Sequence, residues 1–176
     1  MRIASIVNDS IVDGQGIRLA VFVQGCSHNC KGCHNPHTHD PEGGHEESVE
    51  FILHMLKSDP LVSGITLTGG EPFDQALVCA RLAHGARRLG YDVWTYTGYT
   101  YEEIISSKRA DWQLLLANTT VLVDGPFVES LKSYELKFRG STNQRLIDVK
   151  ESFRSNCVIE YSLKENILSK FQVPIS

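Results

Sequence analysis

Three cysteines follow a short apolar run in the stretch Leu19-Ala-Val-Phe-Val23-Gln-Gly-Cys26-Ser-His-Asn-Cys30-Lys-Gly-Cys33. The run 19–23 predicts a buried strand that stops at Gly25, so the cysteines must lie on the loop that follows it. Three thiolates on one short loop can hold three corners of a compact metal site. The sequence therefore predicts a metal centre at the end of a buried strand.

The number of cysteines leaves the identity of the metal open. Four cysteines complete an ordinary [4Fe–4S] cluster, so three would leave one iron open to an exogenous ligand. Structural zinc with a histidine as fourth ligand is the alternative, since five histidines lie close by: His28, His34, His37, His39 and His45. Zinc sites usually pair two half-sites, and the sequence has no second cysteine half-site. A disulfide is disfavoured because such clusters bind metal in a reducing compartment.

The two remaining cysteines are not expected to be ligands. Cys79 falls within a predicted helix, and Cys157 falls within a further strand expected at 157–160. Both are interpreted as small buried hydrophobes, which is the usual role of an unpaired cysteine away from a reactive site.

The composition is that of one globular domain over residues 1–176. Hydrophobic residues make up 41% and the formal net charge is −4, so the chain can bury a core without disulfide staples. No Lys/Arg run provides the basic face that nucleic-acid binding needs. The sequence has no basic-then-apolar leader and no apolar run of membrane-spanning length. We therefore expect a cytoplasmic protein with neither nucleic acid nor a membrane as a partner.

Hydrophobic periodicity predicts strands and helices in alternation. Strands are expected at 19–23, 64–68, 92–96 and 120–123, and helices at 47–57, at 74–89 and from Tyr101 onwards. Alternating strands and helices imply parallel pairing with right-handed crossovers. The predicted fold is α/β, either an open sheet or a partial (open) TIM-like β/α barrel, with the active site at the carboxyl ends of the strands.

Local signals refine this expectation. Thr100 and Glu103 have the spacing of a capping box, and Gly90 provides a C-terminal stop for the helix before it. Trp94 and Tyr96 lie two residues apart and would share one face of their strand.

A glycine-rich turn, Thr68-Gly69-Gly70-Glu71-Pro72, ends the second predicted strand. Its two glycines let a ligand approach the backbone closely, and the Glu71 carboxylate could hold an ammonium group. Alone, such a turn is more often only a tight turn. One crossover after a three-cysteine loop, it becomes a strong candidate for the binding site.

The cysteine loop with His34–Asn35 and the Gly-Gly-Glu-Pro turn resemble the radical S-adenosylmethionine superfamily. The finer pattern is similar to the activating proteins of anaerobic (class III) ribonucleoside-triphosphate reductases. It comprises Asp13-Gly14-x-Gly16-x-Arg18, Thr97-Gly98-Tyr99, Val123-Asp124-Gly125-x-Phe127 and Arg139-Gly140-Ser141-x-Asn143-Gln144. The resemblance covers a core of about residues 6–147.

The resemblance implies a radical mechanism. Three irons of one [4Fe–4S] cluster would be held by Cys26, Cys30 and Cys33, and the methionine end of S-adenosylmethionine would chelate the fourth. The reduced cluster would cleave this cofactor to a 5′-deoxyadenosyl radical. That radical would take a hydrogen from one glycine in the large subunit of the reductase. The family also suggests a reduced flavodoxin-type electron donor.

The resemblance also implies which residues contact the cofactor. They are Gly32, Cys33, His34, Gly69, Gly70 and Glu71. The last three would lie near the methionine amino group, and the ring of His34 near the adenine. The ribose and carboxylate contacts stay unassigned, with four candidates at strand ends and in a late loop: Thr97, Tyr99, Asp124 and Arg139.

Three other functions stay open at this point. An activase of the pyruvate formate-lyase type usually has a longer chain, and some relatives carry extra clusters, for which two spare cysteines are too few. A small-molecule radical enzyme, as in the deazapurine pathway, is disfavoured only by the resemblance of the loop 139–145. A non-catalytic zinc-binding interaction module comes from a different class.

The chain is shorter than the ~250 residues of a full barrel, so an open side could admit a glycine segment of a large partner.

Overall fold

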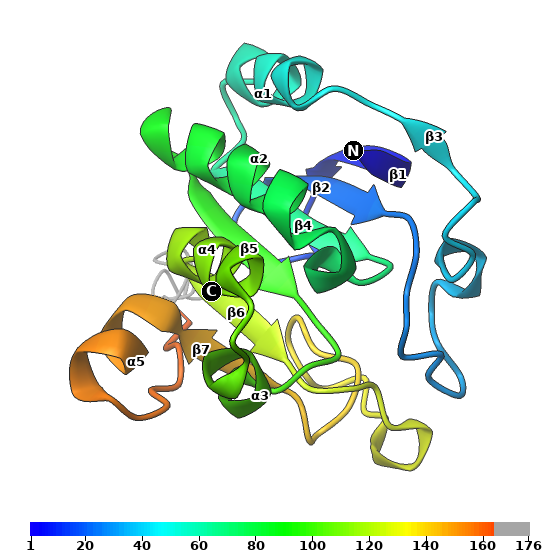
Figure 1. The fold of residues 1–176 in the computed structure, drawn as a ribbon, viewed down its shortest axis with the longest axis vertical. Helices are drawn as coiled ribbons and strands as arrows, with labels where there is room; N and C mark the ends of the chain where they lie inside the picture. The colour runs from blue at the N-terminus through cyan, green and yellow to red at the C-terminus, as the bar shows by residue number, and fades with distance from the viewer. Residues whose placement is uncertain (164–176) are drawn as a thin grey trace, which may run out of the picture.

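Residues 1–163 form an open seven-stranded sheet with helices on one face in the computed structural model, which describes this part of the chain (Figure 1). The strand order is β3-β1-β2-β4-β5-β6-β7. The strands are β1 (Arg2–Ser10), β2 (Arg18–Val23), β3 (His45–Glu46), β4 (Gly64–Gly69), β5 (Asp92–Tyr96), β6 (Val121–Asp124) and β7 (Arg145–Asp148). The predicted α/β fold with an open sheet is confirmed, while the TIM-like barrel stays a prediction. The single domain predicted over residues 1–176 stays a prediction, because residues 164–176 lie outside the part of the chain that the structure describes.

Strands β2, β4, β5 and β6 form the parallel centre of the sheet, and they correspond to the four strands expected from the sequence. β2 pairs with β4 from Arg18 opposite Gly64 to Val23 opposite Gly69. Because all four strands run in the same direction, their carboxyl ends meet at one edge. The cysteine loop leaves this edge after β2, and the Gly-Gly-Glu turn leaves it after β4.

The helices begin and end at recognisable signals. They are α1 (Val49–Ser58), α2 (Ala76–Arg88), α3 (Tyr101–Ser106), α4 (Ala110–Asn118) and α5 (Val149–Ser155), with 3-10 turns η1 (Pro36–Thr38), η2 (Pro72–Gln75) and η3 (Glu129–Leu131). The predicted helix 47–57 begins at Val49, because the Ser48 side chain accepts a hydrogen bond from the Phe51 N–H. The predicted helix 74–89 is divided between η2 and α2. The predicted capping box of Thr100 and Glu103 is confirmed at the start of α3.

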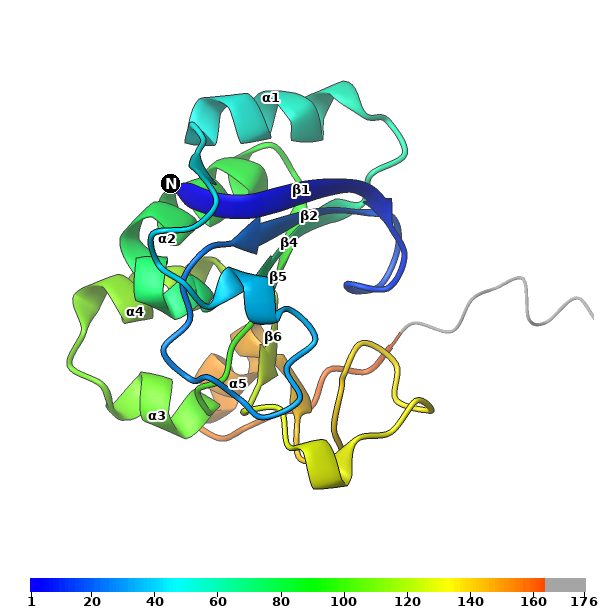
Figure 2. The same ribbon diagram turned by 90° about the vertical axis from the view of Figure 1, so that its right-hand side faces the viewer.

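The main core lies between the sheet and the helices α1, α2 and α4, which cover one face (Figure 2). Alternate strand residues such as Val21 and Leu67 pack there against Leu82 of α2, and all three are fully buried. Trp94 and Tyr96 lie on the other face of β5, as predicted, within a smaller apolar cluster. The helix side therefore supplies most of the buried apolar surface, and the other face is free to carry polar groups.

The two antiparallel strands that flank the parallel centre, β1 and β7, were not predicted from the sequence. β1 pairs antiparallel with β2, and β7 pairs antiparallel with β6, so the sheet is mixed. The pairing of β1 shifts register twice, between Ile3 and Ser5 and between Val7 and Ser10, which disrupts the period of two. β7 has only four residues, too few for a periodic signal. The expectation of parallel pairing therefore holds only for the centre.

Two expectations about the later part of the chain are wrong. Residues 157–160 do not form a strand, and Glu160 makes only an isolated bridge to Ile147. The chain turns after α5 at Asn156, whose φ is +51°, so Cys157 is exposed instead of buried. Cys79 is fully buried in α2, as predicted. Among residues 1–163, no helix is both long and apolar enough to cross a membrane.

Candidate metal centre

The three predicted ligand cysteines lie on one loop between β2 and η1. The two ends of the loop are joined by backbone hydrogen bonds. The Gly25 N–H donates to the carbonyl of Thr38 at 2.8 Å, and the Cys26 N–H donates to the carbonyl of His39 at 3.2 Å. The loop is therefore closed at its base, and all three cysteine side chains are half-buried: Cys26, Cys30 and Cys33.

The third cysteine sits in a tight turn. The Cys33 N–H donates to the carbonyl of Cys30 at 3.2 Å, and Gly32 between them has a φ of +73°, which favours glycine. The Asn35 N–H donates to Sγ of Cys33 at 3.3 Å. Hydrogen bonds of this kind to sulfur tune iron–sulfur clusters, so the turn already offers the thiolate one such donor.

The first cysteine is in a less favourable electrostatic environment for a bare thiolate. Burial raises the pKa of the Cys26 thiol above its usual value, and the charges of Glu71 and Asp74 raise it further. Backbone N–H groups at His28 and Asn29 oppose these effects. A metal ligand must be deprotonated, so a bound cation would supply the positive charge that this thiolate lacks.

The donor set of the cysteine loop fits an iron–sulfur cluster. The loop offers three thiols and the N–H donors described above. Within residues 1–163, no three metal-ligating side chains stand at the mutual spacing of a metal site. This applies to Cys26, Cys30 and Cys33 as well as to a Cys3His shell, so neither ligand set is preformed in the described part of the chain.

Glu71 is almost completely buried at the base of the cysteine loop, with 1% of its surface exposed. Its Oε1 accepts hydrogen bonds from the Phe73 N–H and the Thr97 hydroxyl, both at 2.9 Å. Its Oε2 accepts one from the Gly98 N–H at 2.8 Å. Oε2 also lies 3.0 Å from Nε2 of His28, an ion-pair contact and not a well-aligned hydrogen bond. Donors of this chain therefore surround the carboxylate.

The ring of His28 is enclosed between the cysteine loop and the segment after β5. It meets Tyr99 edge-on, with ring centroids 4.3 Å apart and planes at 65°. A Cβ atom on Gly98 would come within 2.5 Å of the ring, so only glycine fits there. The Glu71 carboxylate raises the pKa of His28 above its ordinary value, and burial opposes this effect.

The two glycines of the predicted ligand turn pack against the start of the cysteine loop. A Cβ atom on Gly70 would collide with the carbonyl oxygen of Gly25, and one on Gly69 would lie 2.7 Å from Cα of Phe22. The Glu71 N–H donates to the carbonyl of Gly25 at 2.7 Å. The glycines are therefore required, at least in part, for contact between two segments of the chain itself.

A cleft of about 1350 Å³ opens on the face of the sheet that the main helices leave uncovered. Side chains near the carboxyl ends of three central strands reach it: Phe22, Thr68 and Tyr96. Residues 11–16, His34, Asn35, Phe127, Arg139 and Gly140 are among its walls. The ring centroids of His34 and Phe127 are 5.0 Å apart. The cleft exceeds the ~300–1,000 Å³ of ordinary small-molecule sites, so it has room for more than one small ligand.

Arg18 accounts for the motif Asp13-Gly14-x-Gly16-x-Arg18 beside the cleft. The guanidinium is fully buried and donates from Nε to the Thr66 hydroxyl at 2.7 Å. That hydroxyl donates in turn to the carbonyl of Asp13 at 2.7 Å. A Cβ atom on Gly14 would lie 2.7 Å from Cδ of Arg18. The motif therefore holds the loop before β2 against the sheet.

The motif Arg139-Gly-Ser-x-Asn-Gln144 closes the loop between β6 and β7. Oε1 of Gln144 accepts hydrogen bonds from the N–H groups of Gly140 and Ser141, at 2.8 and 3.2 Å, and its Nε2 donates to the carbonyl of Gly125 at 3.1 Å. Arg139 faces the cleft, and its buried Nε has no hydrogen-bond partner within the described residues. A ligand acceptor would satisfy this group.

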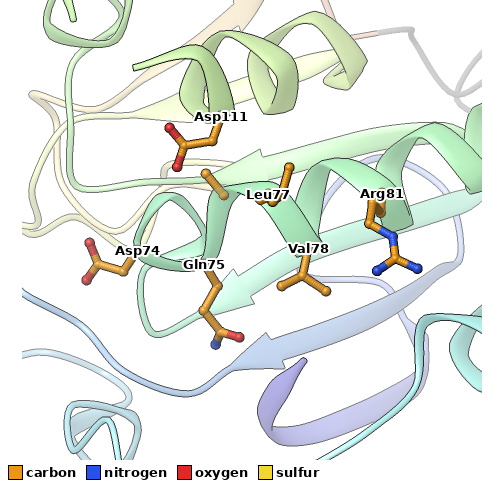
Figure 3. Close-up of a pocket in the computed structure, with 7 residues that line it drawn as sticks. Asp74, Gln75, Leu77, Val78, Arg81 and Asp111 are labelled. Carbon is orange, nitrogen blue, oxygen red and sulfur yellow. The ribbon is translucent and has the colours of Figure 1, made fainter. Parts of the chain in front are cut away.

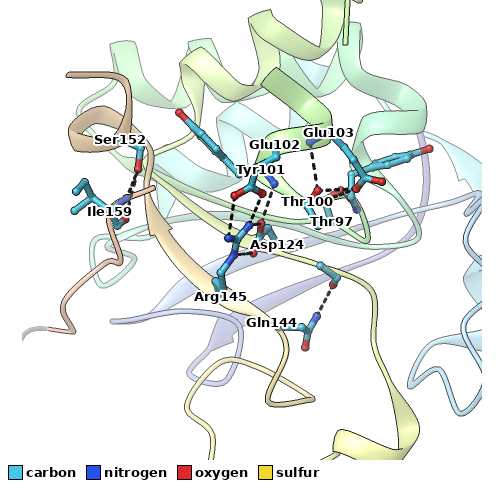
Figure 4. A network of polar contacts seen from close by, with 12 residues as sticks. Thr97, Thr100, Tyr101, Glu102, Glu103, Asp124, Gln144, Arg145, Ser152 and Ile159 are labelled. Carbon is cyan, nitrogen blue, oxygen red and sulfur yellow. Dashed lines mark hydrogen bonds and ion pairs between the residues drawn. The ribbon is translucent and has the colours of Figure 1, made fainter. Parts of the chain in front are cut away.

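Asp124 and Arg145 form a second polar network at the end of β6 (Figure 4). Asp124 is 1% exposed and accepts a hydrogen bond from the Tyr101 N–H at 2.8 Å. Arg145 contacts both oxygens of Asp124, at 3.0 and 2.5 Å, and both oxygens of Glu102, at 3.0 and 2.7 Å. Asp124 is therefore engaged within the fold. Of the candidates for a cofactor contact, Arg139 is the one that faces the cleft with an N–H group lacking a partner among the described residues.

A smaller pocket of about 300 Å³ lies on the outer side of α2 (Figure 3). Its walls include Asp74, Leu77, Arg81 and Asp111. Asp74 also accepts a hydrogen bond from the Ser27 N–H at 2.9 Å, which ties η2 to the cysteine loop. Among the described residues, no cysteine lines either cavity, but the large cleft is lined by His34 and Asn35, which directly follow Cys33. The large cleft is therefore the better candidate for the reaction site.

Residues 12–147 match the profile of a family described as a 4Fe-4S single cluster domain. A protein of Vibrio cholerae named anaerobic ribonucleoside-triphosphate reductase-activating protein is 37% identical over 142 residues, covering 76% of this chain and 89% of the relative. The chain belongs to this family of activating proteins. Members of the same name from Escherichia coli K12 and from phage T4 are each 35% identical, over 76% and 77% of this chain and 90% and 86% of their own length.

Membership in the activating-protein family agrees with the position of the cysteine loop. The matched region includes all three clustered cysteines and excludes Cys157. The chain is therefore a member of a family of activating enzymes with a 4Fe–4S domain. The sequence analysis located the loop and the glycine turn, but it did not identify His28 as the contact between them.

Proposed function

We propose that this chain reductively cleaves S-adenosylmethionine and places a glycyl radical on the large subunit of an anaerobic ribonucleoside-triphosphate reductase. The observation that carries the proposal is the group of three half-buried thiols on one closed loop, without a fourth cysteine on that loop. Cys26, Cys30 and Cys33 would hold a [4Fe–4S] cluster with one open iron. When bound, this cluster supplies the electron for cofactor cleavage.

Residues of the cleft would bind and orient the cofactor. His34 and Phe127 offer adjacent rings for the adenine. Nε of Arg139, which has no hydrogen-bond partner among residues 1–163, offers a donor for a carboxylate. Gly32, Gly69 and Gly70 would contact the cofactor through backbone atoms, because Gly32 precedes the third cysteine and the glycine turn lies against the start of the cysteine loop.

The open side of the sheet would admit the partner. A reductase glycine can react only if its backbone reaches the cofactor, and the cleft is larger than a cofactor needs. We propose that the curved open sheet acts as a partial TIM-like barrel in this respect. A reduced flavodoxin-type donor and a cytoplasmic location, with neither nucleic acid nor a membrane as partner, complete the proposal.

The decisive test is anaerobic reconstitution of the whole chain with iron and sulfide. We expect a brown protein that, once reduced, converts S-adenosylmethionine to 5′-deoxyadenosine and produces a glycyl radical signal on added reductase. Cys26→Ala, Cys30→Ala and Cys33→Ala should each abolish cluster binding and cleavage. The matched controls Cys79→Ala and Cys157→Ala should retain both.

Other results would redirect the assignment. A colourless protein that holds one zinc and forms no deoxyadenosine would establish the zinc-binding module. Deoxyadenosine formation with a glycyl radical only on pyruvate formate-lyase would establish the other activase. Turnover of a small molecule without any glycyl radical would establish the third alternative.

A further inference from the structure

We propose that Glu71 is a positioning residue that fixes the cysteine loop through His28, and that it does not bind the ammonium group of the cofactor. This inference rests on the proposed function for its meaning. It rests on the contacts of Glu71 and His28 for its evidence. It also replaces the role that the family resemblance assigned to Glu71.

The carboxylate of Glu71 is already engaged. Three hydrogen bonds, from Phe73, Thr97 and Gly98, and the contact with His28 are distributed over its two oxygens. A carboxylate has about four acceptor sites. An ammonium group would therefore have to displace one of these donors, which would leave a buried polar group unpaired.

The carboxylate is also closed off from the reaction cleft. Glu71 is 1% exposed, so almost none of its surface can be reached by a ligand. Its neighbour on the strand side, Thr68, does reach the cleft. The side chain of Glu71 is instead turned towards the segment after β5 and the cysteine loop.

His28 is well placed to transmit this contact to the ligands. It lies between Cys26 and Cys30, so its position affects the directions of both thiols. The ring is held by Glu71 on one side and by Tyr99 on another. The preceding residue is held too, because the N–H and hydroxyl of Ser27 both contact Asp74, at 2.9 and 3.2 Å.

Asp74 thus holds Ser27, and Glu71 holds His28, two consecutive residues between Cys26 and Cys30. Glu71 and Asp74 both belong to the segment that follows β4, so they hold the loop from the same side. The loop would then be presented to incoming iron with Cys26 already oriented. Loss of the Glu71–His28 contact should affect cluster assembly before it affects cofactor binding.

The test compares His28→Ala, His28→Gln and Glu71→Gln in the full chain. The first readout is alkylation of Cys26 in the metal-free protein, followed by peptide mass spectrometry. We expect His28→Ala and Glu71→Gln to speed alkylation by about fivefold, the upper end for loss of a partly exposed ion-pair contact. Each rate is first divided by the thiolate fraction from that variant's own pH profile, because removing the charge of Glu71 also lowers the pKa of Cys26. His28→Gln keeps a side-chain N–H and should restore most of the protection. His37→Ala, an exposed histidine of the same loop, is the matched control and should have no effect.

The second readout is the reconstituted protein. Iron content should fall and the electron paramagnetic resonance spectrum of the reduced cluster should change in His28→Ala. The affinity of the cluster-loaded fraction for S-adenosylmethionine should stay within about threefold of the unsubstituted chain. His28→Gln should recover the original spectrum.

The opposite pattern would overturn the inference. Glu71→Gln would then weaken cofactor binding by about tenfold or more, with Cys26 alkylation and iron content unchanged. The alkylation result does not depend on the cofactor. A chain that protects Cys26 as expected but never cleaves S-adenosylmethionine would retain the positioning role and refute the proposed function instead.

Discussion

Glu71 and Asp124 are two buried carboxylates that follow two strands of the same parallel sheet, β4 and β6. Each is 1% exposed, and each accepts a backbone N–H at the start of the next helical element, from Phe73 and Tyr101 respectively. They differ in the basic side chain that faces them. Asp124 faces Arg145 of β7, whereas Glu71 faces His28 of the cysteine loop.

The comparison shows that a buried carboxylate at the end of a strand can stabilise either the sheet itself or a loop that carries functional residues. Arg145 is always charged, and it joins β7 and α3 to the end of β6. The partner of Glu71 belongs to a loop outside any regular element. Removing one contact should therefore unfold the edge of the sheet, and removing the other should release the ligand loop.

The largest expected effect comes from Arg145→Met. This change leaves Asp124 buried without its cation, so we expect a loss of about 3 kcal/mol in unfolding free energy, the low end of the range for a broken buried pair. Anaerobic denaturant unfolding of the metal-free chain would measure it. Arg81→Met is the control, because the exposed Arg81–Glu50 pair should contribute less than about 1 kcal/mol. Equal losses in the two variants would remove the distinction between the networks.

A smaller effect is expected from Thr97→Val, which deletes a hydroxyl donor to Glu71. We expect a loss of about 1.5 kcal/mol in unfolding free energy, together with faster alkylation of Cys26. Thr95→Val is the control, because it breaks the buried hydroxyl contact between Thr95 of β5 and Thr119 at the end of α4. It should destabilise the chain without affecting Cys26. If both variants expose Cys26 equally, the Glu71 network has no special connection to the loop.

The smallest effect concerns pH and the third member of the Asp124 network. The hydrogen bond from Arg145 lowers the pKa of Glu102 below its ordinary value of 4.5. The folded chain therefore binds fewer protons there, so this stabilisation is present above about pH 4.5 and is lost as the pH falls through the lowered pKa. Denaturant unfolding of the original chain and of Glu102→Gln would be compared between about pH 6 and pH 3. The difference in unfolding free energy should be less than about 1 kcal/mol, because Glu102 is exposed, and it should vanish on acidification. A gap that widens would contradict the assignment.

The sequence predicted the centre of the molecule better than its edges. Runs such as 19–23 and 64–68 are apolar and end at glycines, so their strands and the loop after them could be located from local pattern. β1 contains register shifts and Asp9 with a φ of +54°, and these features hide its period. The segment 157–160 is too short for its pattern to distinguish a strand from the turn that begins at Asn156, so Cys157 was predicted to be buried and is exposed.

The polar networks could not be predicted for a different reason. Glu71 and His28 meet only because β2 and β4 are neighbours in the sheet, and that neighbourhood is a property of the fold. The sequence marked Glu71 and Asp124 as polar groups at strand ends, which is correct. It gave no measure of how fully the chain's own donors would surround them.

The strand order also bears on synthesis of the chain. Strands β1 and β3 lie at one side of the sheet. The other five, β2, β4, β5, β6 and β7, lie side by side in the order in which they occur along the polypeptide. Each of these five strands can pair with the previous strand of the series as it leaves the ribosome. None must insert between two strands that are already paired. His28, Glu71 and Gly98 are all translated before Arg145. The ligand loop can therefore take its shape while the last edge of the sheet is still being made.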